Sequence, residues 1–139
     1  MSKLKVFIDG GSKGNPGPAS IGGAFYIDTK KIFQFNQSIG NATNNDAEYQ
    51  ALIHALKEIK KQKEKLINDL EVEKIEFYSD SRLLVNQING LFKVKNGKIR
   101  EYILKIRTLE KAINLPISYR QIPRKENKEA DRLVNTLPS

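Results

Sequence analysis

The sequence predicts an α/β fold in which one mixed five-stranded sheet carries helices on both faces. Three strand-like segments near the N-terminus are separated by turn signals, which is typical of an antiparallel meander. Two later strand-like segments are each preceded by a helical pattern, which is typical of strands added through helical crossovers. At 139 residues, the chain is expected to form a single domain, residues 1–139.

The first three segments are rich in β-branched and aromatic residues. Leu4–Asp9 (LKVFID) is expected to be the first strand and to end at Gly10-Gly11. The stretch Gly10–Pro18 holds four glycines and two prolines, so a turn-rich loop is expected there. The runs SIGGAFYID and KKIFQFNQSI follow as two strands with a tight turn near residues 28–31.

A helix is predicted next, over Asn44–Lys61. Its apolar stripe consists of Ala51, Leu52, Ala55, Leu56 and Ile59. Residues suited to its N-cap are Thr43, Asn44 and Asn45. Glu48 lies four residues before Leu52 on the same stripe, so a carboxylate is expected at the buried face and needs a partner. His54 is about 200° from Leu52 around the helix and is expected at the surface.

The C-terminal half continues the alternation. Lys74–Asp80 (KIEFYSD) is expected to be a strand, and a short helix is expected from Ser81 to a stop at Gly90. A longer helix, ended by Pro116, is marked by Ile99, Tyr102, Ile103, Ile106, Leu109 and Ile113. PISYRQI is the last expected strand, and a final helix is predicted from about Glu126 to Thr136.

The composition excludes several kinds of catalytic site. The chain has no cysteine, which excludes disulfides, thiolate catalysis and the usual zinc sites. Its single histidine, His54, excludes multi-histidine metal sites and disfavours a serine–histidine triad. A net charge of +8 suits a polyanion, although a solvated lysine-rich surface would give the same value. The sequence has no run of 18 apolar residues and no secretory signal, so no membrane span and a cytoplasmic location are expected.

Four carboxylates lie where predicted strands end or beside the apolar faces of predicted helices. They are Asp9, Glu48, Asp80 and Asp131. If these acids gather, they need a strong counter-charge, because unpaired charges are disfavoured away from water. Two divalent cations would supply it, and Mg²⁺ prefers carboxylate, water and phosphate oxygens. Salt bridges from lysines to the four acids are the alternative explanation.

Five sequence strings resemble, in order, the signature blocks of type 1 ribonuclease H. They are FIDGGSKGNPGP, TNNDAEYQALIHAL, YSDSRLLVNQING, VKN and NKEADRLVN, spanning residues 7–135. The resemblance implies a ribonuclease H-like fold and an endonuclease that cuts the RNA strand of RNA–DNA hybrids with two Mg²⁺ ions, for which Mn²⁺ is a substitute. It also implies that Asp9 bridges both ions, with Glu48 and Asp80 on one and Asp131 on the other.

The resemblance further implies where the substrate binds. A glycine-rich loop brings its backbone close to a sugar edge, and the 2′-hydroxyl distinguishes RNA from DNA. The implied contact residues are Gly11, Ser12, Asn15, Thr43, Asn44, Asn45, Lys95 and Asn96. Thr43 and Asn15 are also expected to hold a DNA-strand phosphate, whereas helix capping alone is the alternative role for Asn44 and Asn45.

A basic segment is the best candidate for contact with the hybrid backbone. Its residues are Lys93, Lys95, Lys98, Arg100, Lys105 and Arg107, against one acid, Glu101. Phe92 precedes it and is expected either to stack on a deoxyribose or to be buried.

The chain departs from the family pattern in two places. Many bacterial members carry a histidine ten residues before the last aspartate, where this chain has Gln121. His54 is on the wrong face of its helix to replace it, and Arg124 is a candidate substitute. Few residues separate Gly90 from the VKN string, so a basic helical protrusion is expected to be missing. Hybrid binding is then expected to be weaker and more salt-sensitive than in members that carry it.

Two alternatives to a hybrid-specific nuclease remain open. One is a non-catalytic nucleic-acid-binding module of the same fold, although such a module has no reason to keep four mutually repelling carboxylates. The other is a variant that also cleaves double-stranded RNA. No obligate protein partner is evident in the sequence, and a monomer is expected.

Overall fold

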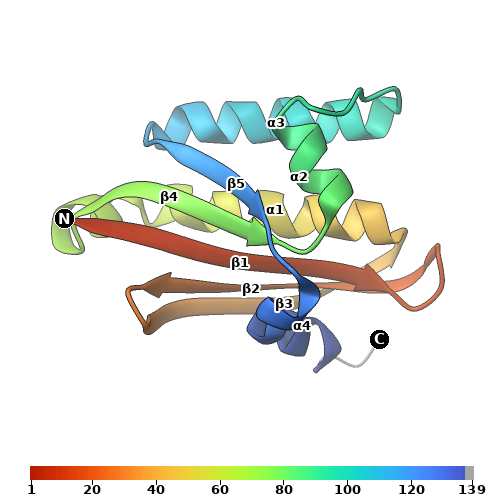
Figure 1. Cartoon of the computed structure of the whole chain (residues 1–139), viewed down its shortest axis with the longest axis horizontal. Coiled ribbons are helices and arrows are strands. Elements are labelled where there is room, and N and C mark those ends of the chain that lie inside the picture. Colours follow the sequence, from red (N-terminus) through yellow and green to blue (C-terminus); the bar gives the residue numbers. More distant parts are fainter. Residues whose placement is uncertain (137–139) are drawn as a thin grey trace.

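The computed structural model describes residues 1–136 as one five-stranded sheet with helices on both faces (Figure 1). The strands are β1 (Ser2–Ser12), β2 (Gly17–Ile27), β3 (Lys30–Ala42), β4 (Val72–Ser79) and β5 (Ile117–Gln121). The helices are α1 (Asn44–Lys61), α2 (Arg82–Ile88), α3 (Gly97–Ile113) and α4 (Lys128–Asn135). The strand order is β3-β2-β1-β4-β5. The two pairings among β1–β3 are antiparallel, and β4 is parallel to both β1 and β5, which confirms the predicted mixed sheet.

Helices α1 and α4 lie on opposite faces of the central strand β1. A Cβ atom built on Gly10 would point into the backbone of α1, at Ala47. Gly22, which pairs with Asp9, would point into α4 at Leu133. Because neighbouring residues of a strand point to opposite faces, Asp9 lies on the α4 face and Gly10 on the α1 face. The main core fills the α1 side, where α3 packs against α1 in turn.

The start of α1 is fixed by local chemistry. Thr43 is its N-cap and accepts a hydrogen bond from the backbone N–H of Asp46, whose side chain accepts one from Thr43 N–H in return. This reciprocal arrangement satisfies two backbone donors that the helix itself leaves without partners. The predicted helix bounds are confirmed, and of the three N-cap candidates Thr43 takes the position, so Asn44 and Asn45 do not cap the helix.

Several other boundaries differ from the expectations. Strand β1 does not end at Gly10-Gly11 but continues to Ser12, because Gly10 and Gly11 pair with Ile21 and Ser20 of β2. The glycine-rich loop is therefore confined to residues 13–16. Helix α3 ends at Ile113, three residues before Pro116, because Asn114 adopts the left-handed conformation with φ of 55°.

The final helix also begins later than expected, because Arg124–Glu126 forms a separate 3₁₀ turn ahead of Lys128. His54 is half-buried rather than fully at the surface, with its ring 4.3 Å from that of Phe35 on β3. In residues 1–136, no helix combines the length and the hydrophobicity that crossing a membrane requires.

Candidate active site

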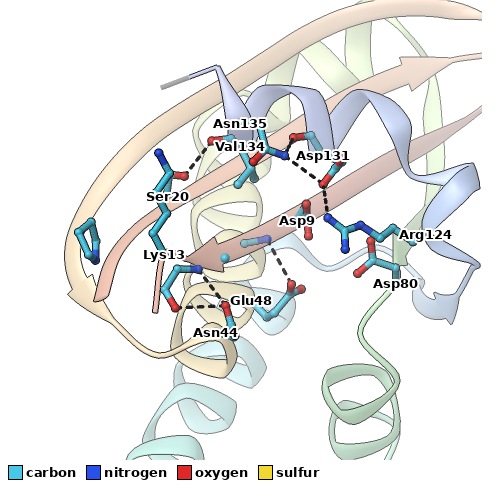
Figure 2. A pocket seen from close by; sticks show the side chains of 14 residues that line it. Asp9, Lys13, Ser20, Asn44, Glu48, Asp80, Arg124, Asp131, Val134 and Asn135 are labelled. Atoms are coloured by element: carbon cyan, nitrogen blue, oxygen red, sulfur yellow. Dashed lines mark hydrogen bonds and ion pairs between the residues drawn. The ribbon is translucent and has the colours of Figure 1, made fainter. Parts of the chain in front are cut away.

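Three of the four predicted acids meet at one end of the sheet. Asp9 lies in β1, Asp80 directly follows the parallel strand β4, and Glu48 is in the second turn of α1. One carboxylate oxygen of each lies within 4.8 Å of the others. Neighbouring parallel strands end at the same edge of a sheet, which brings Asp80 close to Asp9. Figure 2 shows the three side chains around one cleft.

Gly10 brings Glu48 to this group. A Cβ atom at Gly10 would lie 2.3 Å from the carbonyl oxygen of Ala47, so only glycine permits this approach of α1 to β1. The backbone N–H of Gly10 donates to Glu48 Oε1 at 3.4 Å. The close contact between the two backbones thus sets the position of the Glu48 carboxylate.

Asp131, the fourth acid, lies at the rim of the same cleft, which has a volume of about 390 Å³. Its Oδ1 accepts hydrogen bonds from Asn135 Nδ2 at 3.2 Å and from Arg124 at 3.3 Å. Figure 2 shows Arg124 reaching toward Asp131 across the cleft. Asp131 is therefore already partly neutralised, unlike the three acids of the inner group.

Within residues 1–136, no basic side chain forms an ion pair with the inner group, and Asp9 and Glu48 hold their protons more tightly than usual. Burial, together with repulsion from Asp80 and Asp131, raises the pKa of Asp9 to about 7. Burial and the neighbouring Asp9 and Asp80 raise the pKa of Glu48 well above its usual value. Glu48 Oε2 is one of two buried side-chain oxygens in residues 1–136 without a hydrogen-bond partner. Clustered carboxylates with an unmet acceptor are the donor set that a hard divalent cation requires.

The predicted substrate loop is hydrogen-bonded to the start of α1. Ser12 donates from its backbone N–H to Asn44 Oδ1 at 2.9 Å, and Asn44 donates from its own N–H to Asn15 Oδ1 at 3.0 Å. Gly11, Ser12 and Asn44 line the cleft with the acids. Asn15, Thr43 and Asn45 do not line it: Asn45 is half-buried, and the Thr43 hydroxyl is engaged in capping.

The predicted contacts near α3 lie elsewhere. Lys95 is exposed, and Asn96 caps α3 by accepting from the N–H groups of Lys98 and Ile99. Neither Lys95 nor Asn96 lines the cleft, and among the described residues the same holds for Gln121, which is exposed at the end of β5. The predicted auxiliary residue Arg124 does line the cleft.

Three members of the basic segment have partners within the chain. Lys98 pairs with Asp46 at 3.4 Å, the Arg100 guanidinium donates to Val94 O, and Arg107 donates to Glu110 and Ile88 O. The alternative of a buried Phe92 is wrong, because 36% of this residue is exposed and the Arg82 guanidinium lies 5.4 Å from its ring. Because Lys98 and Arg107 are paired with acids, the segment presents fewer unpaired charges than its sequence indicates.

Four polar residues at the site were missing from the prediction. Lys13, Ser20 and Asn135 line the cleft, and Asn127 is buried against Asp80. Ser20 reaches the cleft only because β2 pairs with the extended end of β1, which the sequence pattern does not reveal. Asn127 stands four residues before Asp131, a spacing that predicts the same helix face but not the contact with Asp80.

A family model described as reverse transcriptase-like matches residues 7–137. The chain is similar to Ribonuclease HI of Halobacterium salinarum, with 33% identity over 134 residues that cover 96% of this chain and 63% of that protein. It is also similar to the bifunctional protein Rv2228c of Mycobacterium tuberculosis, with 35% identity over 135 residues and 96% of this chain covered. The chain spans about a third of the length of that mycobacterial protein, 35%.

Solved structures of RNase H proteins are also similar to this chain. The complex of LC11-RNase H1 with an RNA/DNA hybrid matches with a TM-score of 0.85 and 35% identity, covering 96% of this chain and 94% of that one. The N-terminal RNase H domain of Rv2228c from Mycobacterium tuberculosis matches with a TM-score of 0.84 and 34% identity, covering 98% and 93% of the two chains.

Proposed function

The chain belongs to the reverse transcriptase-like family of ribonuclease H domains, and from this premise we propose that it hydrolyses the RNA strand of RNA–DNA hybrids. The observation that carries the proposal is the inner group of Asp9, Glu48 and Asp80, with oxygens within 4.8 Å of one another and no positive partner in residues 1–136. Four acids salt-bridged to lysines would not give this arrangement. A non-catalytic module would gain nothing from the cost of burying them.

The residues that would hold divalent cations are the inner group and Asp131. Two bound Mg²⁺ or Mn²⁺ ions would stabilise the attacking and leaving oxygens of a phosphodiester and lower the pKa of the attacking water. The chain's own contribution is to hold the carboxylates in place, through the Gly10–Glu48 hydrogen bond and the Asn135–Asp131 hydrogen bond. On the loop beside the acids, Lys13 adds positive charge at the rim of the cleft, where a phosphate would approach.

Selection of RNA is assigned to the loop and the start of α1. The hydrogen-bonded set Ser12, Asn15 and Asn44 presents amide and hydroxyl groups beside the acids. Such groups both donate and accept, as does the 2′-hydroxyl that distinguishes RNA from DNA. LC11-RNase H1, a structural relative, binds an RNA/DNA hybrid. We assign the same class of substrate to this chain.

The test is cleavage of a labelled RNA–DNA hybrid with Mg²⁺ by the wild type and by Asp9→Asn. The substitution removes a buried charge but keeps the shape, so the rate is expected to fall at least about 100-fold. Glu76→Gln is the matched control. Like Asp9, Glu76 is a buried acid, but it lies on β4 and does not line the cleft. Undiminished cleavage by Asp9→Asn would contradict the two-metal assignment. A wild type that binds the hybrid without cutting it would favour the binding module.

Arg124 is the proposed auxiliary residue in place of the histidine that other members carry. Its contact with Asp131 at 3.3 Å and its exposed position allow it to approach a phosphate at the rim of the cleft. Arg124→Ala is expected to slow cleavage about 10-fold or more, whereas Gln121→Ala is expected to leave the rate near the wild-type value. Equal rates for all three proteins would remove Arg124 from the proposal. Double-stranded RNA in the same assay decides whether the substrate range is broader.

A further inference from the structure

Asn127 is a buried polar side chain beside the acids that the proposed mechanism does not use. Only 1% of the residue is exposed, and it lies between the 3₁₀ turn and helix α4. Its Nδ2 donates to the backbone carbonyl of Ile8 at 2.9 Å and to Asp80 Oδ2 at 3.4 Å. One side chain at the N-cap of α4 therefore touches both β1, next to Asp9, and the carboxylate that follows β4.

The contact lies where two parallel strands separate. The pairing of β1 with β4 ends at Phe7 and Tyr78, and Ser79 of β4 then pairs only with Gln121 of β5. Beyond this point, β1 continues along β2 toward Asp9 while the chain after β4 turns away at Asp80. The Asn127 amide connects the two strands here, because it donates to the carbonyl of the residue before Asp9 and to Asp80 itself.

The amide can point only one way. Both of its neighbours, the Ile8 carbonyl and the Asp80 carboxylate, are acceptors, so a reversed amide would place Oδ1 against two oxygens. In the observed orientation, Oδ1 is the second buried oxygen in residues 1–136 without a partner. A buried acceptor left without a hydrogen bond is unfavourable. The two hydrogen bonds that Nδ2 donates offset this cost.

We propose that Asn127 is a positioning residue that fixes the Asp80 carboxylate relative to Asp9. The assignment rests on the proposed function, because the role of Asp80 does. A side chain that orients a ligand-bearing carboxylate typically affects metal affinity or activity about 10–100-fold. The backbone of Asn127 separately accepts from Asp131 N–H and donates to Arg124 O. These bonds survive substitution, so the start of α4 does not depend on the amide.

The first experiment compares Asn127→Ala with Ile59→Val. Ile59 is a core residue near the C-terminal end of α1 and outside the cleft, so its variant loses packing without touching the site. We expect Asn127→Ala to lower kcat about 10–100-fold with KM nearly unchanged, and to weaken Mn²⁺ binding in the absence of substrate about 10-fold. Ile59→Val should keep both values. Loss of stability in Asn127→Ala, with kcat and Mn²⁺ affinity within about twofold of wild type, would overturn the assignment.

The second experiment uses proteins in which Asn127 is intact. The side-chain amide protons of Asn127 are followed by NMR in the wild type and in Asp80→Asn. Removing the charge of the acceptor should shift one Nδ2 proton of Asn127, whereas the amide of Asn89, which donates to Tyr119 O, should not move. An unshifted Asn127 signal would overturn the contact. This measurement needs no activity, so it decides the assignment even if Asn127→Ala does not fold or the wild type cleaves no hybrid.

Discussion

At the scale of single residues, Asp9 makes a contribution to folding that opposes its proposed role. It is 7% exposed and faces other acids, so its charged form is disfavoured and the pKa of its carboxyl is raised to about 7. In the unfolded chain, the same group titrates near 3.8. The folded protein therefore holds this proton more tightly than the unfolded chain does. The arrangement that would bind a cation weakens the fold whenever the cation is absent.

This gives a pH dependence with a definite sign. Without divalent cations, the stability that the protonated Asp9 contributes is fully present below about pH 4 and is lost as the pH rises through about 7. Relative to Asp9→Asn, the wild type is expected to lose at most about 4 kcal/mol across this range, since one pKa unit corresponds to about 1.4 kcal/mol. Urea denaturation in EDTA from pH 4 to 8 measures the difference. Mg²⁺ added at pH 8 should restore stability to the wild type only, and parallel profiles for both proteins would contradict the prediction.

At the scale of elements, the contact between β1 and α1 depends on Gly10. An added Cβ would meet backbone atoms of Ala47 and Glu48 at 2.3–2.8 Å, and backbone cannot move aside as a flexible side chain can. Gly10→Ala is expected to cost about 1–3 kcal/mol or more in the free energy of unfolding and to displace Glu48 from the inner group. Thermal or urea denaturation, with hybrid cleavage, checks both effects.

Gly97→Ala is the control for that substitution. Gly97 begins α3, its φ is not in the left-handed region, and a Cβ there would meet no atom within 4 Å. This variant should be neutral or more stable by about 0.4–1 kcal/mol, because alanine restricts the unfolded chain. Similar losses for both variants would show that the Gly10 contact is not special.

The same contact marks the limit of sequence reasoning. Helix α1 could be predicted to its first residue because Thr43 and the apolar stripe act within one segment. The extension of β1 through Gly10 could not, because it depends on pairing with β2 and on the approach of α1. Likewise, the acids were predicted from their motif strings, whereas the contact of Asn127 with Asp80 depends on where β1 and β4 separate.

At the scale of the whole molecule, a net charge of +8 surrounds a cleft lined by four acids. The proposed hybrid substrate would therefore be attracted by the surface and repelled by the cleft until bound cations neutralised the acids. Residues 89–96, which connect α2 to α3, form neither helix nor strand. The described structure therefore has no basic helical protrusion at this place. Attraction then comes from lysines spread over the surface, such as the exposed Lys95.

Salt dependence tests whether Lys95 contacts the hybrid. Each phosphate contact contributes about 0.9 to the slope of the logarithm of the association constant against the logarithm of salt concentration. Lys95→Ala is expected to lower the magnitude of that slope by about one. Lys74→Ala is the control, because Lys74 is exposed near the start of β4, at the opposite end of the strand from Asp80. Fluorescence anisotropy with labelled hybrid measures both slopes, in an Asp9→Asn background and with EDTA to prevent cleavage. If Lys74→Ala lowers the slope as much as Lys95→Ala, binding follows net charge alone and Lys95 has no particular place on the hybrid.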